Sequence, residues 1–139
     1  MKKITQAVIF CGGMGTRLGH LTKKQPKPMV DVSGKPFLEH LIIQLKKNGI
    51  DKILLLTGFQ EQIIRKHFKN GSKWNVSIKY SYSPAETKTA LRLFFVKKLL
   101  EDYFILLYSD NYCSLNLSKN FSIYKEIKKP ILITVCKKN

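Results

Sequence analysis

An apolar run that leads straight into a glycine-rich turn constrains this chain most. Residues 7–11 (AVIFC) are apolar enough for a strand buried on both faces, and residues 12–18 (GGMGTRL) follow without a break. Because glycine has no side chain, backbone N–H groups of such a turn can approach a phosphate closely. Arg17 and Lys27 add positive charge nearby, one as a planar fork and one as a mobile point. The pattern indicates either a phosphate site or a plain packing turn, and its spacing fits neither the Rossmann fingerprint nor the Walker A loop.

Strands and helices alternate along the rest of the chain. Apolar runs and alternation predict strands at 4–11, 53–57, 76–82, 103–108 and 131–136. Helical spacing predicts helices at about 36–47, 60–68, 87–100 and 119–127. This order predicts an α/β fold, a Rossmann-like three-layer arrangement with a mostly parallel sheet and helices on both faces.

The ends of two predicted strands are where a ligand is expected. In open parallel sheets, ligands bind beyond the carboxyl ends of the strands. The glycine turn follows the first strand, and Asp110 follows the strand at 103–108. Asp110 is either a hard oxygen ligand suited to Mg²⁺ or half of a turn-forming Asp-Asn pair.

Length and cysteine content limit the class of protein. The 139 residues make one domain, 1–139, with no apolar run near the roughly 20 residues that span a bilayer. The basic start leads into a strand, so a signal peptide is not expected. The odd number of cysteines (Cys11, Cys113 and Cys136) argues against a disulfide framework and against a zinc site. Reduced thiols suit a cytoplasmic protein.

The formal net charge of +16 is high for this length. It suits anionic ligands such as nucleotides and sugar phosphates. A nucleic-acid-binding module is the alternative, but the lysines are spread in pairs over every segment, with no arginine-rich arm or aromatic-interleaved patch. We therefore expect small anionic ligands rather than nucleic acid. Gln6, just before the first apolar run, is expected to be a surface polar group.

The complete motif string resembles that of the sugar-1-phosphate nucleotidyltransferases. Their N-terminal signature reads GGxGTRL, then PKPM and GKP, which this chain carries at residues 12–18, 26–29 and 34–36. The nearest look-alikes act on heptose, mannose or glucose 1-phosphates. The resemblance implies transfer of a nucleoside monophosphate from a nucleoside triphosphate to a sugar 1-phosphate, giving nucleotide-sugar and pyrophosphate. It also implies Mg²⁺ as cofactor, and a homo-oligomer remains open.

The resemblance assigns roles to individual residues of this chain. The implied catalytic residues are Arg17, Lys27 and Asp110, with Asp110 as the magnesium ligand. The implied nucleotide-binding residues are Gly12, Gly13, Met14, Gly15, Thr16, Arg17 and Lys27. No protein nucleophile is expected, because fixed cations and positioning can stabilise attack of one phosphate on another.

The chain departs from the family pattern in three places. Ser109 stands where the family has the glycine of a Gly-Asp pair. Residues 85–90 (AETKTA) stand where the family has a Leu-Gly-Thr-Ala-Gly-Ala type segment, so both glycines are lost. The family's catalytic domain is also much longer, and its later part supplies much of the sugar pocket and a second magnesium-binding aspartate. We therefore expect the N-terminal portion of the usual domain, truncated at its C-terminus. The alternative is a catalytically inactive nucleotide-binding remnant or subunit.

Overall fold

A parallel sheet forms the centre of the molecule. The computed structural model describes residues 3–16, 19–20 and 24–135. In this part of the chain, the main sheet has the strand order β5-β4-β1-β6, and every neighbouring pair is parallel. Its strands are β1 (Gln6–Cys11), β4 (Lys52–Thr57), β5 (Ser77–Tyr82) and β6 (Phe104–Tyr108). Because β1 lies between β4 and β6, the glycine turn leaves the sheet from its middle.

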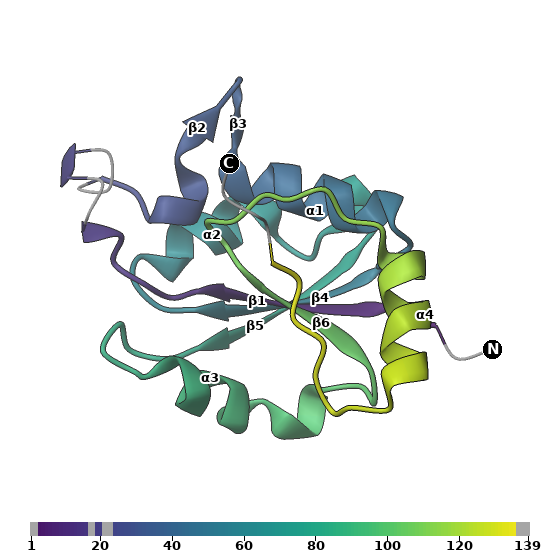
Figure 1. Ribbon diagram of the computed structural model, residues 1–139. Helices are drawn as coiled ribbons and strands as arrows, with labels where there is room; N and C mark the ends of the chain where they lie inside the picture. Colours follow the sequence, from purple (N-terminus) through teal and green to yellow (C-terminus); the bar gives the residue numbers. More distant parts are fainter. Residues whose placement is uncertain (1–2, 17–18, 21–23, 136–139) are drawn as a thin grey trace.

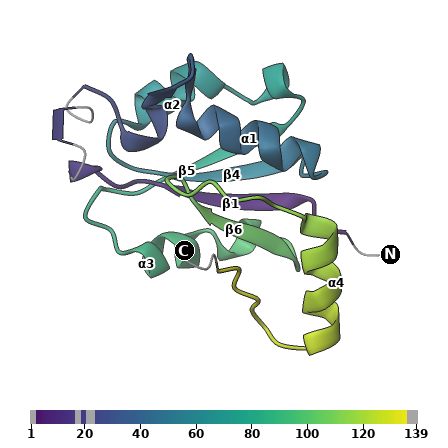
Figure 2. The same ribbon diagram turned by 45° about the horizontal axis from the view of Figure 1, so that its top comes forward.

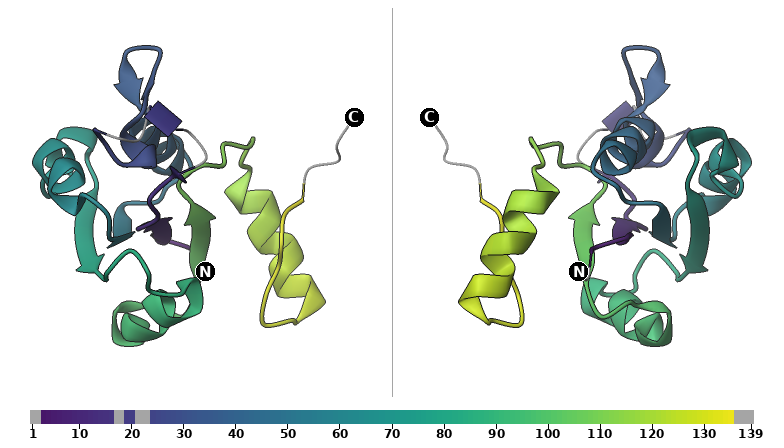
Figure 3. Two further views of the ribbon diagram at one scale, coloured as in Figure 1. Left: turned by 90° about the vertical axis from the view of Figure 1, so that its left-hand side faces the viewer. Right: turned by 90° about the vertical axis from the view of Figure 1, so that its right-hand side faces the viewer.

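Helices cover both faces of this sheet, which confirms the α/β three-layer prediction. Figures 1 and 2 show two helices, α1 (Phe37–Lys47) and α2 (Glu61–Phe68), on one face and α3 (Thr89–Phe95) on the other. A fourth helix, α4 (Leu117–Ile127), lies beyond the β6 edge (Figure 3). The small antiparallel hairpin of β2 (Asp31–Val32) and β3 (Lys35–Pro36) projects from the α1 side. Short 3-10 turns are η2 (Lys27–Met29), η3 (Ser72–Trp74) and η4 (Lys97–Leu99).

The side chains of β1 explain why the sheet needs two helical layers. Alternate residues of a strand point to opposite faces, and every residue of β1 is buried. Ala7, Ile9 and Cys11 belong to the core cluster beneath α1 and α2. Val8 and Phe10 belong to the separate cluster that includes Val96, just after α3. The prediction of a strand buried on both faces is confirmed.

The predicted α1 forms because its apolar residues recur at helical spacing. Leu38, Leu41, Ile42 and Leu45 are each at most 1% exposed and form one stripe over the sheet. The helix stops at Lys47, and Gly49 then adopts φ +83°, a left-handed conformation that glycine tolerates without strain.

Two predicted helices differ from the structure at their ends. The helix expected over 87–100 is interrupted, because Val96 leaves helical geometry at φ −100°, ψ 9° and buries its side chain against the sheet. The helix expected over 119–127 begins earlier, at Leu117. The Asn116 side chain accepts a hydrogen bond from the Lys119 N–H at 3.0 Å and so caps its first turn.

The expected strand at 131–136 is wrong over residues 131–135, and Cys136 lies outside the described residues. Residues 131–135 join no ladder, and Ile131, Ile133 and Val135 are 71%, 76% and 82% exposed. Figure 3 shows the segment running back alongside α4. An apolar, β-branched run becomes a strand only where a sheet edge is placed to pair with it. Within the described ranges, no helix is long and apolar enough to cross a membrane.

Gln6 is also placed differently from the prediction. It is 7% exposed, and its side-chain Nε2 donates to the Leu99 carbonyl at 2.8 Å while its Oε1 accepts from the Glu101 N–H at 2.9 Å. The amide is buried because both of its hydrogen-bonding groups find backbone partners. Gln6 therefore holds the segment that precedes β6 against the start of β1.

Candidate functional site

A pocket of about 310 Å³ lies at the carboxyl ends of β1 and β6. The glycine turn contributes Gly12, Gly13, Gly15 and Thr16 to its lining. Lys27 approaches from the 3-10 turn η2, and Ser109 and Asp110 follow β6 directly. Met14 does not line this pocket and is 50% exposed. Arg17 lies outside the described residues. The structure therefore brings together most of the residues that the sequence singled out.

Lys27 and Asp110 form an ion pair across the pocket. The Lys27 Nζ lies 2.8 Å from the Asp110 Oδ2, although the two residues are 83 positions apart in the sequence. Lys27 is held by a rigid backbone, because it stands between two prolines and Pro28 and Met29 are buried. Both side chains remain more than a third exposed, so their attraction contributes about 0–1 kcal/mol to stability and is readily exchanged for a ligand.

The two leading glycines of the turn have different neighbours. A Cβ atom added at Gly12 would lie 2.1 Å from a guanidinium nitrogen of Arg92, so protein packing requires glycine there. A Cβ added at Gly13 would meet nothing within 4 Å. Protein packing therefore gives no reason for glycine at position 13, whereas close approach of a ligand to the backbone does.

Arg92 is a pocket residue that the sequence reasoning missed. It lies on α3 and is 5% exposed. Within the described residues, all of its hydrogen-bond acceptors are backbone carbonyls. Burial lowers the pKa of its guanidinium, and the nearby Tyr82, Cys11 and Glu86 act in the opposite direction. The available signal was a lone arginine within the otherwise apolar stretch ALRLFF of the α3 sequence.

Cys11 lies at the inner end of the pocket and does not carry a reactive thiolate. Its side chain is 1% exposed, and its Sγ is 3.6 Å from the Ile9 carbonyl oxygen, to which it donates. Burial raises the pKa of the Cys11 thiol to about 12, against smaller lowering effects of Ser109 and Arg92. The thiol is therefore protonated at neutral pH, and a protonated thiol is a poor nucleophile.

The described residues do not form a metal site by themselves. They contain no group of three or more His, Cys, Asp or Glu side chains that could hold a metal ion. Asp110 is the one carboxylate among the residues that line the pocket in the described ranges. Mg²⁺ binds through one or two carboxylates together with substrate phosphates and water. The pocket therefore fits Mg²⁺ that arrives with a phosphate ligand, and Asp110 would hold it.

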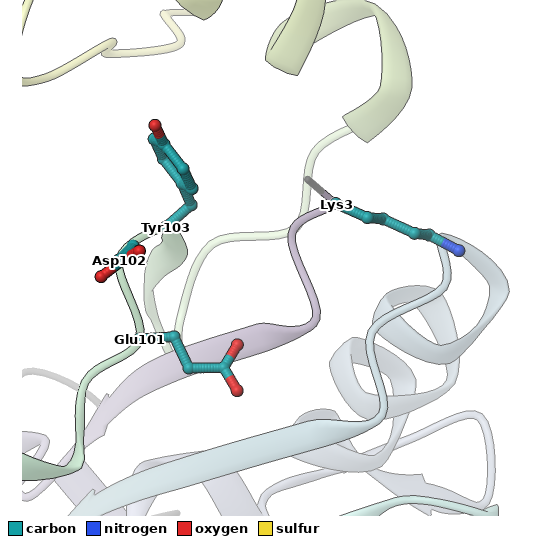
Figure 4. Close-up of a pocket in the computed structure, with 4 residues that line it drawn as sticks. All are labelled: Lys3, Glu101, Asp102 and Tyr103. Atoms are coloured by element: carbon teal, nitrogen blue, oxygen red, sulfur yellow. The ribbon is translucent and has the colours of Figure 1, made fainter. Parts of the chain in front are cut away.

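A second hollow, of about 380 Å³, lies near the opposite ends of the strands. Figure 4 shows its lining residues, Lys3, Glu101, Asp102 and Tyr103, with side chains that point in different directions. Glu101 binds Lys52 at 2.6 Å and Thr5 at 2.7 Å, and the Lys52 hydrogen bond is the main cause that lowers the pKa of its carboxyl. The polar groups of this hollow do not converge on one point, so we place the functional site at the glycine turn.

Comparison with known proteins shows the family of this chain. The family described as "Nucleotidyl transferase" matches residues 6–139. The chain is 35% identical over 114 residues to the D-glycero-alpha-D-manno-heptose 1-phosphate guanylyltransferase of Campylobacter jejuni, covering 82% of this chain and 51% of that protein. It is 36% identical over 112 residues to the UTP–glucose-1-phosphate uridylyltransferase AglF of Haloferax volcanii, covering 81% of this chain and 46% of that protein.

A solved structure gives the same result for the fold. The crystal structure of HddC from Yersinia pseudotuberculosis complexed with GMP-PN superposes with a TM-score of 0.77 at 30% identity, covering 87% of this chain and 54% of that one. The chain belongs to the sugar-1-phosphate nucleotidyltransferase family. It spans about half the length of the curated relatives that it matches.

Proposed function

We propose that this protein transfers a nucleoside monophosphate from a nucleoside triphosphate to a sugar 1-phosphate. The observation that carries the proposal is the pairing of Lys27 with Asp110 across a pocket bordered by the glycine turn. A cation, an acid and a glycine-rich turn at one pocket suit a triphosphate that carries a metal ion. Because nucleoside triphosphates are cytoplasmic, the same proposal places the protein in the cytoplasm.

Each pocket residue has a proposed task in this reaction. Lys27 leaves its ion pair and binds phosphate oxygens, where its charge offsets the negative charge that develops during transfer. Main-chain N–H groups of residues 12–16 hold the rest of the triphosphate, with Arg17 as a second cation. Asp110 would hold Mg²⁺, which would neutralise phosphate charge when bound. The resemblance assigns these roles. The shared lining of one pocket supports those of Lys27, Asp110 and the glycine turn, whereas the role of Arg17 rests on the resemblance.

The reaction needs no covalent intermediate on the protein. An oxygen of the sugar 1-phosphate attacks the α-phosphorus, the bond between the α-phosphorus and the bridging oxygen to the β-phosphate breaks, and pyrophosphate leaves with the electron pair. The protein's part is to align the two anions and to lower their repulsion. Consistent with this chemistry, the thiol nearest the pocket, Cys11, is buried and protonated.

A second function is triphosphate binding without turnover. The described pocket contains a single carboxylate, and Glu86 and Lys88 stand where the family keeps short residues. Both features favour binding over chemistry in this chain taken by itself. This alternative and the transferase proposal share the triphosphate site and differ in whether pyrophosphate is released.

Two measurements on the full chain distinguish these functions. A coupled pyrophosphate-release assay would start with GTP and UTP, because the relatives are named guanylyl- and uridylyltransferases, with heptose, glucose and mannose 1-phosphates as acceptors. Calorimetry with the same triphosphates, with and without Mg²⁺, measures binding directly. Release of pyrophosphate that depends on both substrates supports the transferase. Binding without release supports the second function, and no binding to any triphosphate contradicts both.

A further inference from the structure

The guanidinium of Arg92 is hydrogen-bonded by the backbone of two chain segments beside the pocket. Its Nη1 donates to the carbonyl of Thr57, at the end of β4, at 2.7 Å and to that of Ser83 at 3.3 Å. Its Nη2 donates to the Pro84 carbonyl at 2.6 Å, and its Nε donates to the Thr87 carbonyl at 3.1 Å. A guanidinium has five N–H groups in a rigid fork, so one side chain can join several carbonyls that do not contact each other.

The same group also packs against the glycine turn. A Cβ atom at Gly12 would lie 2.1 Å from Nη1, 2.4 Å from Cζ and 2.8 Å from Nη2 of Arg92, so the guanidinium plane lies directly against the Gly12 Cα. Arg92 thus contacts the end of β1, the end of β4 and the loop 83–87. Residues of the turn and of this loop line the pocket from different directions.

The charge of Arg92 is not cancelled within the described part of the chain. Its acceptors are neutral carbonyls, and no carboxylate in the described ranges lies at ion-pair distance from it. Lys27, by contrast, is paired with Asp110. A buried and unpaired charge is costly to keep, and its field is strong because water does not screen it. Among the described residues that line the pocket, Arg92 is therefore the cation without an ion-pair partner, and Glu86 acts on its charge only at longer range.

We propose that Arg92 is a positioning residue of this pocket. It holds loop 83–87 and the Gly12 turn in the arrangement that admits an anionic ligand, and it leaves the pocket with a net positive potential. The anionic ligand rests on the proposed function, whereas the fixing of the loop does not. Two independent measurements therefore test the proposal.

The first measurement is ligand binding by variants of Arg92. Arg92→Gln keeps hydrogen-bonding capacity but removes the charge. Arg92→Lys keeps the charge but loses the planar set of guanidinium N–H donors. By calorimetry with Mg²⁺ and GTP or UTP, we expect Arg92→Gln to weaken binding at least tenfold and Arg92→Lys to weaken it less. The matched control is Arg65→Gln, because Arg65 is an exposed arginine of α2 that pairs with Glu61 at 3.0 Å, outside the pocket lining. It should bind within twofold of the wild type.

The second measurement needs no ligand. In the structure the Ser83 N–H donates to the Thr57 carbonyl at 3.0 Å, and the Thr87 N–H donates to the Pro84 carbonyl at 3.0 Å. We expect amide hydrogen exchange at Ser83 and Thr87 to rise at least tenfold in Arg92→Gln, while the amides of β4 keep wild-type protection. Alkylation of Cys11, followed at peptide level by mass spectrometry, should also be faster in Arg92→Gln than in the wild type.

Chemical rescue gives a further check. In Arg92→Ala, added methylguanidinium should restore slow amide exchange at Ser83 and Thr87, and methylammonium at equal ionic strength should not.

The outcomes separate the two proposals. A folded Arg92→Gln with wild-type exchange at Ser83 and Thr87 overturns the positioning role, whatever binds in the pocket. Raised exchange together with wild-type triphosphate affinity overturns its part in ligand binding. If the wild type binds no triphosphate, the proposed function fails while the exchange experiment still decides whether Arg92 fixes the loop. If Arg92→Gln does not fold, Arg92→Lys provides the same comparison with the charge retained.

Discussion

At the scale of single residues, the Lys27–Asp110 pair connects a motif near the start of the chain to a strand end far along it. The two side chains are 2.8 Å apart and partly exposed. Such a pair adds little to stability, so its value is the local concentration of one cation and one acid at the pocket. Both groups are therefore available to a ligand of mixed charge, such as a metal-bound triphosphate.

Substitution of Lys27 or of Asp110 should change ligand binding while leaving the stability of the fold almost unchanged. We predict that Lys27→Met and Asp110→Asn each change the free energy of unfolding by less than about 1 kcal/mol. Lys27→Met should lower triphosphate affinity about tenfold or more, because a charge-assisted contact to phosphate is lost. Asp110→Asn should remove the dependence of binding on Mg²⁺. Urea denaturation measures the change in stability, and calorimetry measures the change in triphosphate affinity. The control is Lys46→Met, at an exposed position of α1. If triphosphate binding by Asp110→Asn still depended on Mg²⁺, the role of Asp110 would be contradicted.

The two glycines at the start of the turn should respond oppositely to alanine. Gly12→Ala would push a methyl group into the Arg92 guanidinium, so we predict a loss of about 1–3 kcal/mol in the free energy of unfolding. Gly13→Ala meets open space and should change stability by less than about 1 kcal/mol. If a ligand lies against residue 13, Gly13→Ala should still weaken triphosphate binding. Equal destabilisation by both variants would contradict the packing described for Gly12.

The buried thiol of Cys11 predicts a dependence of stability on alkaline pH. Its pKa rises from an ordinary 9.0 to about 12 because the side chain is buried. Above pH 9 the unfolded chain loses this proton while the folded chain keeps it, so unfolding becomes more favourable by up to about 1.4 kcal/mol per pH unit. Stability should therefore fall more steeply above pH 9 in the wild type than in Cys11→Ala. Tyr80, whose pKa burial also raises to about 12, is present in both proteins, so its main, burial-driven contribution cancels in the difference.

At the scale of elements, β6 and the segment before it depend on contacts with the first strand. β6 pairs with β1 on one side, and Gln6 fixes residues 99–101 through two partly buried hydrogen bonds. Glu101 adds its contacts to Thr5 and Lys52. Because Asp110 follows β6, this anchoring at one end of the strand helps to set the position of the acid at the other.

We predict that Gln6→Ala destabilises the protein by about 1–3 kcal/mol, because it leaves the Leu99 carbonyl and the Glu101 N–H without their partner. Hydrogen exchange should increase first in β6 and only later in β4. Gln62→Ala is the control, since Gln62 is an exposed glutamine on α2. A Gln6→Ala protein with wild-type stability would show that the two hydrogen bonds contribute nothing net.

At the scale of the whole molecule, a large apolar surface remains exposed. Phe94 and Phe95 on α3 are 58% and 62% exposed, and Leu106 and Tyr108 of β6 are 40% and 53% exposed. Together with the exposed apolar residues of 131–135, they leave the protein with much exposed apolar area. Exposed apolar patches and hydrophobic edge strands favour association.

This surface predicts concentration-dependent self-association of the isolated chain. The double variant Phe95→Lys, Ile133→Lys should shift the protein toward monomer in sedimentation velocity, because it places charge on two residues that are 62% and 76% exposed. Far-UV circular dichroism should not change. A control with the same added charge, Ser114→Lys with Ser118→Lys, should leave association unaltered if apolar contact is the cause. A monomer at all concentrations in the wild type would contradict the prediction.

The local patterns of the sequence predicted most of the elements and most of the candidate site. Apolar runs, strand alternation and helical spacing are patterns of residues within a few positions of each other. β1, α1 and β4 could therefore be predicted from the sequence. The motif string likewise predicted Gly12, Gly13 and Lys27 as site residues, and Asp110 followed from its place after an apolar strand.

Tertiary structure alone decided which distant groups meet. The 2.8 Å contact of Lys27 with Asp110 spans 83 residues, and no local spacing encodes it. The burial of Arg92 and Gln6 depends on carbonyl and amide groups of other strands and loops, so the residue type alone did not predict it. Residues 131–135 have the composition of a strand, yet strand formation requires an edge beside them. Local physics thus determined the segments, whereas packing between segments determined the pocket.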